Sequence, residues 1–551
     1  MWKRNVLFVA LCLTGLIAVS AGLLRRERVE HPRHFWPQRY AEPDYRAVID
    51  AVNGEFRASW QKAGVEPAPR ADDLLIARRL SLGLTGTIPS LEEIRKLEKV
   101  PPEDRVEWWV SRLLEDRRYS DYIAERLARA FVGTDNGPFL VFRRRRFVAW
   151  ISDRLFEGDL PYDALVRKLL AEDGLWTDKP EVNFVTASLD QNNDNKPDPI
   201  RLAGRTTRAF LGLRIDCLQC HDDKLGHVSL GEPGHTRDGQ QSDFHQLAAF
   251  FGKVENSALG VRENKAAKGY NYKYLHGEKD ETIPPVVPYF PELLDKNDSL
   301  RRQLAQWVTH KENKPFARAV VNRFWALMLG RPLVQPIDDI PLFGPFPPAL
   351  ETLAADFVQH DYDLRRLIRV MAATEVFQRD SRADFPIEKR HEEAWAVFPL
   401  SRLRPEQVAG GVIQAASVTT IDASSHIIAQ LTKYGETNNF VERYGDMGED
   451  EFTDRGGTIT QRLLMMNGEL VKERTKENPI LNASTRIASF SPDVPTAVDT
   501  AYLTILTRRP SPKERECFAR QISDAPQRER NSELEDLFWT LLNSTEFSWN
   551  H

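Results

Sequence analysis

Apolar residues recur at helical spacing along most of the chain. One stripe is formed by residues four positions apart: Val48, Val52, Phe56 and Trp60. This spacing brings the four side chains to one face of a helix. We find no comparable run that alternates between apolar and polar positions, as a half-buried strand would. The pattern therefore predicts a mostly α fold with short sheets or none.

Several helix starts are marked by residues that suit the first turn of a helix. Ser90 and Glu93 have the spacing of a capping box, in which each side chain accepts a hydrogen bond from the other residue's backbone N–H. Pro101 and Pro102 precede two acidic residues, and Pro161 precedes another apolar periodic run. These signals predict a succession of separate helices.

Two stretches interrupt the helical texture and divide the chain. Residues 226–241 and 264–291 are rich in Gly, His, Lys, Tyr and Pro, which is typical of long loops. We expect a helical domain over residues 44–255, a linker over 256–298, and a second helical domain over 299–551. The fold class is thus two helical domains joined by a Pro/Gly-rich loop region.

The first 28 residues have the pattern of an export segment. Lys3 and Arg4 precede an uncharged run over residues 6–24, and three arginines follow this run. It is either a signal peptide cleaved near Ala21 or a single membrane anchor, because 19 uncharged residues just reach the length of a span. We favour the uncleaved anchor slightly. Both alternatives place the remaining chain outside the cytoplasm, on the periplasmic side or in the cell envelope.

Composition narrows the function classes. The 551 residues include 75 Lys and Arg against 80 Asp and Glu, a net charge of −5. Nucleic-acid binding is not expected, because affinity for phosphate depends on clustered excess cations. Four cysteines cannot hold a chain of this length together as a disulfide scaffold, so apolar burial must stabilise it.

One motif carries a specific chemistry. Cys217, Cys220 and His221 form C-x-x-C-H, the attachment signal for c-type haem in an exported protein. The spacing lets both thiols form thioethers to the vinyl groups of one porphyrin, with the imidazole beneath the iron as the proximal ligand. We predict one haem, and electron transfer to or from an unidentified redox partner protein.

Two other interpretations of the motif stay open. Zinc could be held by Cys217, Cys220 and His221, with a fourth ligand from His227, His235 or His245 in the same segment; the protein would then be an enzyme or a scaffold. Alternatively, a disulfide could join the two cysteines in a structural envelope protein. That second alternative leaves His221 unexplained.

A further iron ligand is not obvious from the sequence. The candidates are the three histidines His227, His235 and His245, together with Met465 and Met466 far downstream. A histidine in a polar loop is usually solvated, and a Met pair in an apolar helix usually belongs to a core. We retain His227 and His245 as candidates, and a five-coordinate iron is equally admissible.

Two weaker signals have simpler explanations. Asp190, Asn192 and Asp194 resemble the start of a calcium loop, but Arg201 stands where a bidentate Glu belongs, so we favour a hydrated turn. The four arginines at residues 143–146 could contact haem propionates or an acidic partner, although a solvated helix face is the preferred interpretation.

Sequence signatures of common catalytic sites are missing. The chain lacks G-x-S-x-G, H-E-x-x-H, a phosphate-binding G-x-x-x-x-G-K-[ST] loop and a dinucleotide fingerprint. Catalytic residues assembled in space leave no such signature, so the enzyme question stays open. The catalytic residues stay unknown, and we favour an electron carrier or redox module over a stand-alone enzyme.

Long blocks of the chain resemble a known pair of domains. LLIARRLSLGLTGTIPSLEE at 74–93, LPYDALVRKLLA at 160–171, and the block running from TRAFLG through CLQCHDD to QSDFHQLAAFF at 207–251 are similar to the planctomycete cytochrome c domain family. Blocks at 313–340, 401–408 and 541–547 resemble the companion planctomycete domain of unknown function that follows it. The resemblance implies haem at the C-x-x-C-H motif.

The sequence departs from this family beside the motif. The family has a second histidine two residues after His221, where this chain has Asp223. His227 is the natural substitute if that family histidine is a ligand. The family also has a tyrosine directly after an Asp-Phe pair. Here the pair is Asp243-Phe244, and His245 takes the place of that tyrosine.

Overall fold

In the computed structural model, the helix α2 (Pro43–Ala63) carries the predicted apolar stripe. Its four stripe residues are buried, with exposed fractions from 0% at Val52 to 8% at Val48. Pro43 begins the helix, and Gly64 ends it with a φ of +60°, a conformation that glycine adopts without strain. The spacing of apolar residues thus predicted this helix correctly.

The structure describes residues 31–134, 144–188, 196–257, 259–445, 452, 457–478, 482–526 and 529–551. The predicted export segment and the predicted calcium-loop residues Asp190, Asn192 and Asp194 lie outside these ranges. Within them, no helix is long and apolar enough to cross a membrane.

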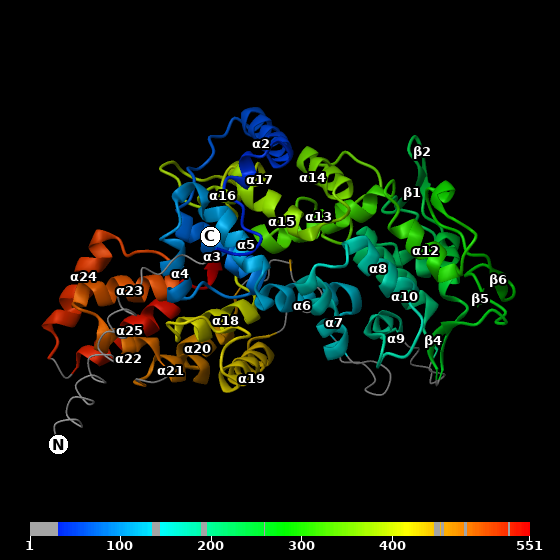
Figure 1. Ribbon diagram of the computed structural model, residues 1–551. Coiled ribbons are helices and arrows are strands. Elements are labelled where there is room, and N and C mark those ends of the chain that lie inside the picture. Colours follow the sequence, from blue (N-terminus) through cyan, green and yellow to red (C-terminus); the bar gives the residue numbers. More distant parts are fainter. Residues whose placement is uncertain are drawn as a thin grey trace, which may run out of the picture.

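Helices make up most of the described chain (Figure 1). The earlier ones are α3 (Asp73–Thr85), α4 (Leu91–Leu97), α5 (Arg105–Leu114), α6 (Arg117–Val132), α7 (Arg144–Glu157), α8 (Tyr162–Ala171), α9 (Asn183–Thr186), α10 (Pro199–Thr206) and α11 (Gln241–Ala248). The middle group is α12 (Leu300–Val308), α13 (Lys314–Leu329), α14 (Pro348–Gln359), α15 (Leu364–Ala373), α16 (Glu375–Gln378) and α17 (Lys389–Glu393). The last are α18 (Pro405–Ala415), α19 (Ile427–Tyr444), α20 (Ile459–Asn467), α21 (Glu469–Thr475), α22 (Ala483–Phe490), α23 (Val494–Leu506), α24 (Pro512–Asp524) and α25 (Arg530–Leu542). The predicted capping box of Ser90 and Glu93 starts α4.

The described strands form separate two-stranded antiparallel sheets. The pairs are β1 (Ser229–Glu232) with β2 (His235–Asp238), β3 (Val254–Ser257) with β4 (Gly260–Glu263), β5 (Tyr270–Tyr272) with β6 (Glu281–Ile283), and β7 (Ser401–Arg402) with β8 (Trp549–Asn550). A mostly α fold with short sheets is therefore confirmed. The hairpins β1–β2 and β5–β6 lie within stretches predicted as loops, because three or four alternating residues are too few to stand out in the sequence.

The buried apolar side chains form two large clusters. The first runs from Tyr45 to Phe398, so helices from both predicted domains share it. At its centre lies α13, in which every residue after Lys314 is buried. The second cluster runs from Leu403 to Phe547 and also includes Leu82 and Ile88. The domain boundaries stay a prediction, and the packing shows that the main core extends across the predicted linker.

Two adjacent arginines on α3, Arg78 and Arg79, connect the two clusters. Both side chains are fully buried, and burial lowers the pKa of Arg78 to about 10 and that of Arg79 to about 9. Their guanidinium groups donate hydrogen bonds of 2.6 to 3.2 Å to the backbone carbonyls of Ile505, Phe547, His551, Phe377 and Arg379. The C-terminus accordingly lies beside α3 in Figure 1.

Substitution of Arg79 by Met should strongly destabilise the chain, because three carbonyls, two of them in fully buried hydrogen bonds, would lose their donor. We expect the free energy of unfolding to fall by about 3–5 kcal/mol. Arg520→Met, at an ion-paired arginine on α24 whose side chain is 67% exposed, is the matched control and should cost less than about 1 kcal/mol. Thermal unfolding followed by circular dichroism measures both, and equal stability of the two variants would contradict the role given to Arg79.

Candidate functional site

Cys217 lies on a short 3₁₀ turn, Asp216–Gln219, and Cys220 is the C-cap residue of this turn. Side chains three residues apart lie above one another in an ideal 3₁₀ turn, so we expect the two thiols to face the same side. The Cys220 N–H donates to the Cys217 carbonyl at 3.3 Å. Both thiols are exposed, and no disulfide joins them.

A buried leucine between the cysteines anchors this turn to the main core. Leu218 has no exposed surface, whereas the thiols on either side of it are open to solvent. A Cβ atom at Gly239 would lie only 2.7 Å from Leu218 Cδ1, so the returning strand needs glycine to pack this closely. The turn thus has one buried side and one open side.

His221 is exposed, and its ring has a defined tautomer. Nδ1 lies 2.8 Å from the backbone carbonyl oxygen of Asp222. Because a carbonyl oxygen only accepts hydrogen bonds, Nδ1 carries the proton and Nε2 carries the lone pair. A backbone carbonyl bonded to Nδ1 is the arrangement that orients a metal-ligating histidine through its other nitrogen. His221 can therefore offer Nε2 as a ligand.

The two aspartates that follow His221 hold the chain in place after the motif. Asp222 Oδ1 accepts a hydrogen bond of 2.9 Å from the Gln241 N–H at the start of α11. Asp223 accepts hydrogen bonds from the backbone N–H groups of Val228 and Leu225, which lower the pKa of its carboxyl group. Asp223 therefore supports the loop that follows the motif.

The surroundings of Cys217 favour the protonated thiol. The residue is exposed, but partial desolvation, with a smaller contribution from the Asp223 carboxylate, raises the pKa of the thiol. Zinc binds a thiolate, so its binding here would have to displace a proton from a thiol that holds it more tightly than usual. A neutral thiol is the form that adds across a vinyl group without a change in net charge.

The Gln219 carbonyl, between the two cysteines, accepts three hydrogen bonds from the elements beneath the turn. The donors are His245 Nε2 at 3.0 Å, Gln241 Nε2 at 3.1 Å and the Tyr272 hydroxyl at 3.3 Å. Sequence patterns had not marked this carbonyl or these partners, except His245. Tyrosines at 270, 272 and 274 recur with the period of a strand, which is the signal that could have identified them.

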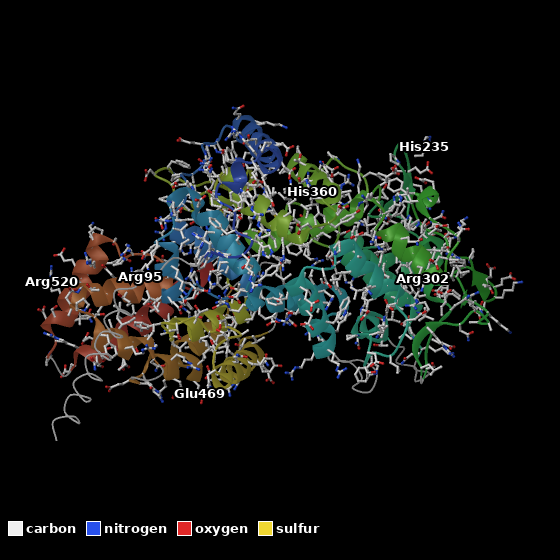
Figure 2. The ribbon with its side chains drawn as sticks, in the orientation of Figure 1. Arg95, His235, Arg302, His360, Glu469 and Arg520 are labelled. Carbon is white, nitrogen blue, oxygen red and sulfur yellow. The ribbon has the colours of Figure 1, made fainter. Side chains whose placement is uncertain are left out.

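The other predicted ligands are not gathered around the motif. His227 and His235 are exposed, and Figure 2 shows His235 at the outer end of the β1–β2 hairpin. Met465 is buried in the second cluster and Met466 is 39% exposed, and both lie on α20, which Figure 1 shows beside α21 and far from β1 and β2. Among the described residues, no group of three or more His, Cys, Asp or Glu side chains could hold a metal ion. The ligand assignments stay predictions.

The basic block is partly engaged with the protein itself. Arg144 donates to both carboxylate oxygens of Glu125 at 2.8 Å, and Arg146 donates to the Thr177 carbonyl. Arg143 lies outside the described residues. Arg144 and Arg146 therefore bind other parts of the protein, which differs from the fully solvated helix face that we preferred.

Family models match both parts of the chain. Residues 51–256, which include the motif, match PSCyt2, described as a protein of unknown function (DUF1549), and residues 300–442 match PSD1, likewise of unknown function (DUF1553). No curated protein and no solved structure matches the chain. The matches confirm two successive family regions in the expected order, and their descriptions assign no activity.

Alkylation of Cys217 should require a higher pH in the folded chain than in the unfolded chain, because the folded environment raises its pKa. A haem-free variant with Ser at the other three cysteines isolates the reaction with iodoacetamide. The same variant in urea supplies the unfolded reference. An alkylation midpoint at or below that of the urea sample would contradict the assignment.

Proposed function

We propose that this chain is an exported monohaem c-type cytochrome that transfers electrons through haem bound covalently at Cys217 and Cys220. The observation that carries the proposal is the geometry of the motif. Two exposed thiols lie three residues apart at a 3₁₀ turn and its C-cap, and the next residue, His221, has Nδ1 bonded to a backbone carbonyl and Nε2 directed elsewhere. These groups fit the chemical requirements of haem attachment, which are two thiols close in sequence and an imidazole that follows them.

Each residue of the motif would have a separate task. Cys217 and Cys220 would hold the porphyrin edge, and His221 would present Nε2 to the iron, oriented by the Asp222 carbonyl. The haem itself would supply the one-electron chemistry. Because the motif lies on the open side of the turn, an attached group would be accessible to a partner protein for electron exchange.

The site favours haem over a structural zinc site. A structural zinc ion needs four protein ligands, whereas a catalytic zinc ion can use three with water in the fourth position. Of the candidates, His227 is exposed without joining a ligand cluster, and His245 uses both ring nitrogens in hydrogen bonds. Zinc and a disulfide nevertheless predict distinct results in the experiment below.

The test is a reduced pyridine haemochrome spectrum of the full chain, produced in the periplasm together with a cytochrome c maturation system. We expect a thioether-type spectrum and a haem-staining band that survives a denaturing gel. Replacement of both motif cysteines by Ser should abolish the band, whereas Cys517→Ser should leave it unchanged. His221→Ala should change the native haem spectrum but leave thioether attachment possible, and His276→Ala, at an exposed histidine, is its control.

A colourless chain, with a co-produced reference cytochrome fully matured, would contradict the proposal. One zinc and no iron per chain would then indicate the zinc site. Absence of both metals, with two additional thiols appearing on reduction, would indicate the disulfide. An unchanged native spectrum in His221→Ala would remove His221 as the proximal ligand.

A further inference from the structure

His245 is buried and packed among aromatic rings, unlike a histidine whose ring nitrogen is open to a metal ion. Its side chain has no exposed surface, and it stacks on Tyr272 with ring centroids 3.4 Å apart. The ring also meets Phe244 and Tyr274 edge-on. Burial lowers the pKa of His245, so the imidazole stays neutral at physiological pH. It is therefore a packed, uncharged ring with a fixed orientation.

The hydrogen bonds of His245 have a defined direction. Nε2 lies 3.0 Å from the Gln219 carbonyl oxygen, which can only accept, so Nε2 carries the proton. Nδ1 then has the lone pair and accepts from the Tyr270 hydroxyl at 2.8 Å. Burial raises the pKa of Tyr270, which keeps this donor protonated. The chain of donors therefore runs from Tyr270 through His245 to the backbone of the motif.

The same helix holds the motif at a second point. The Gln241 N–H at the start of α11 donates to Asp222 Oδ1, and the Gln241 side chain donates to the Gln219 carbonyl. These contacts lie on either side of Cys220 and His221. The hairpin that supplies Tyr270 passes so close to Gly252 that a Cβ there would lie 2.8 Å from the Tyr270 backbone nitrogen. The helix α11 and the β5–β6 hairpin together therefore hold several hydrogen-bond donors in contact with the turn.

We propose that His245 is a positioning residue that, as the N–H donor to the Gln219 carbonyl, holds the C-x-x-C-H turn in the conformation that receives haem. This inference rests on the proposed function, and it replaces the expectation that His245 could be a further metal ligand. To ligate, the ring would have to break its bond to Gln219 or to Tyr270 and leave the stack on Tyr272. Its neutral tautomer instead matches the donor that the turn needs.

The first measurement uses the haem-free full chain and hydrogen–deuterium exchange of peptides covering residues 215–222. His245→Phe keeps an aromatic ring for the stack but removes both nitrogens. We expect about fivefold faster exchange, the effect of losing one hydrogen bond. His245→Gln, whose amide N–H can reach the same carbonyl, should restore slow exchange in part. Tyr270→Phe, a smaller change that removes only the donor to Nδ1, should give an intermediate rate and serves if His245→Phe does not fold.

The second measurement uses the same variants after haem maturation. A positioning role predicts lower haem occupancy in His245→Phe, at least about fivefold by the same reasoning, with an unchanged spectrum per haem. A changed ligation spectrum or reduction potential in the haem that is bound would show a ligand and overturn the proposal. Unchanged exchange in the folded variants would overturn it as well. If wild-type protein takes up no haem, the proposed function fails, while the exchange data still decide whether His245 holds the turn.

Discussion

Five backbone carbonyls from distant parts of the chain share two guanidinium groups on α3. A buried cation is tolerated only where acceptors surround it, and hydrogen bonds to a charged group are stronger than those between neutral groups. Arg78 and Arg79 collect their acceptors from segments some 300 to 470 residues away. Separation of the second cluster from α3 would break the hydrogen bonds from Arg78 to Ile505 and Phe547 and the bond from Arg79 to His551. This constraint holds the two apolar clusters in one arrangement.

The residues just before the C-x-x-C-H motif are also held by contacts with a later part of the chain. The Ile340 N–H donates to the Gly212 carbonyl at 2.7 Å, and Arg214 pairs with Asp338 at 2.8 Å. Asp338 and Ile340, in the segment that follows α13, therefore lie beside the residues that come just before Cys217. The buried Leu218 continues this contact into the main core. The motif is thus a surface feature on a support built from both halves.

Local patterns predicted the parts of this structure that depend on local physics. The stripe of α2 and the capping box of α4 were evident because helix periodicity and capping act over three or four residues. The residue types of C-x-x-C-H likewise indicate their chemistry by spacing alone. The partners of Arg79 could not be found this way, since hundreds of residues separate them. The role of the Gln219 carbonyl was also hidden, because a backbone acceptor has no side-chain signature.

His245 shows how the structure changes the interpretation of a correctly noticed residue. From the sequence, a histidine near a cysteine motif is a candidate ligand. In the fold, its burial and its two hydrogen bonds occupy both nitrogens, and the ring becomes part of the support beneath the turn. The distinction depends on β5, whose alternating tyrosines extend over too few residues to predict a strand by themselves.

The central claim, that this turn receives haem covalently, is tested most directly by the mass of the intact, unfolded chain after periplasmic maturation. The account predicts one species heavier than the polypeptide by the mass of a single haem. A chain with only its polypeptide mass, from cells in which a reference cytochrome is fully matured, would contradict it.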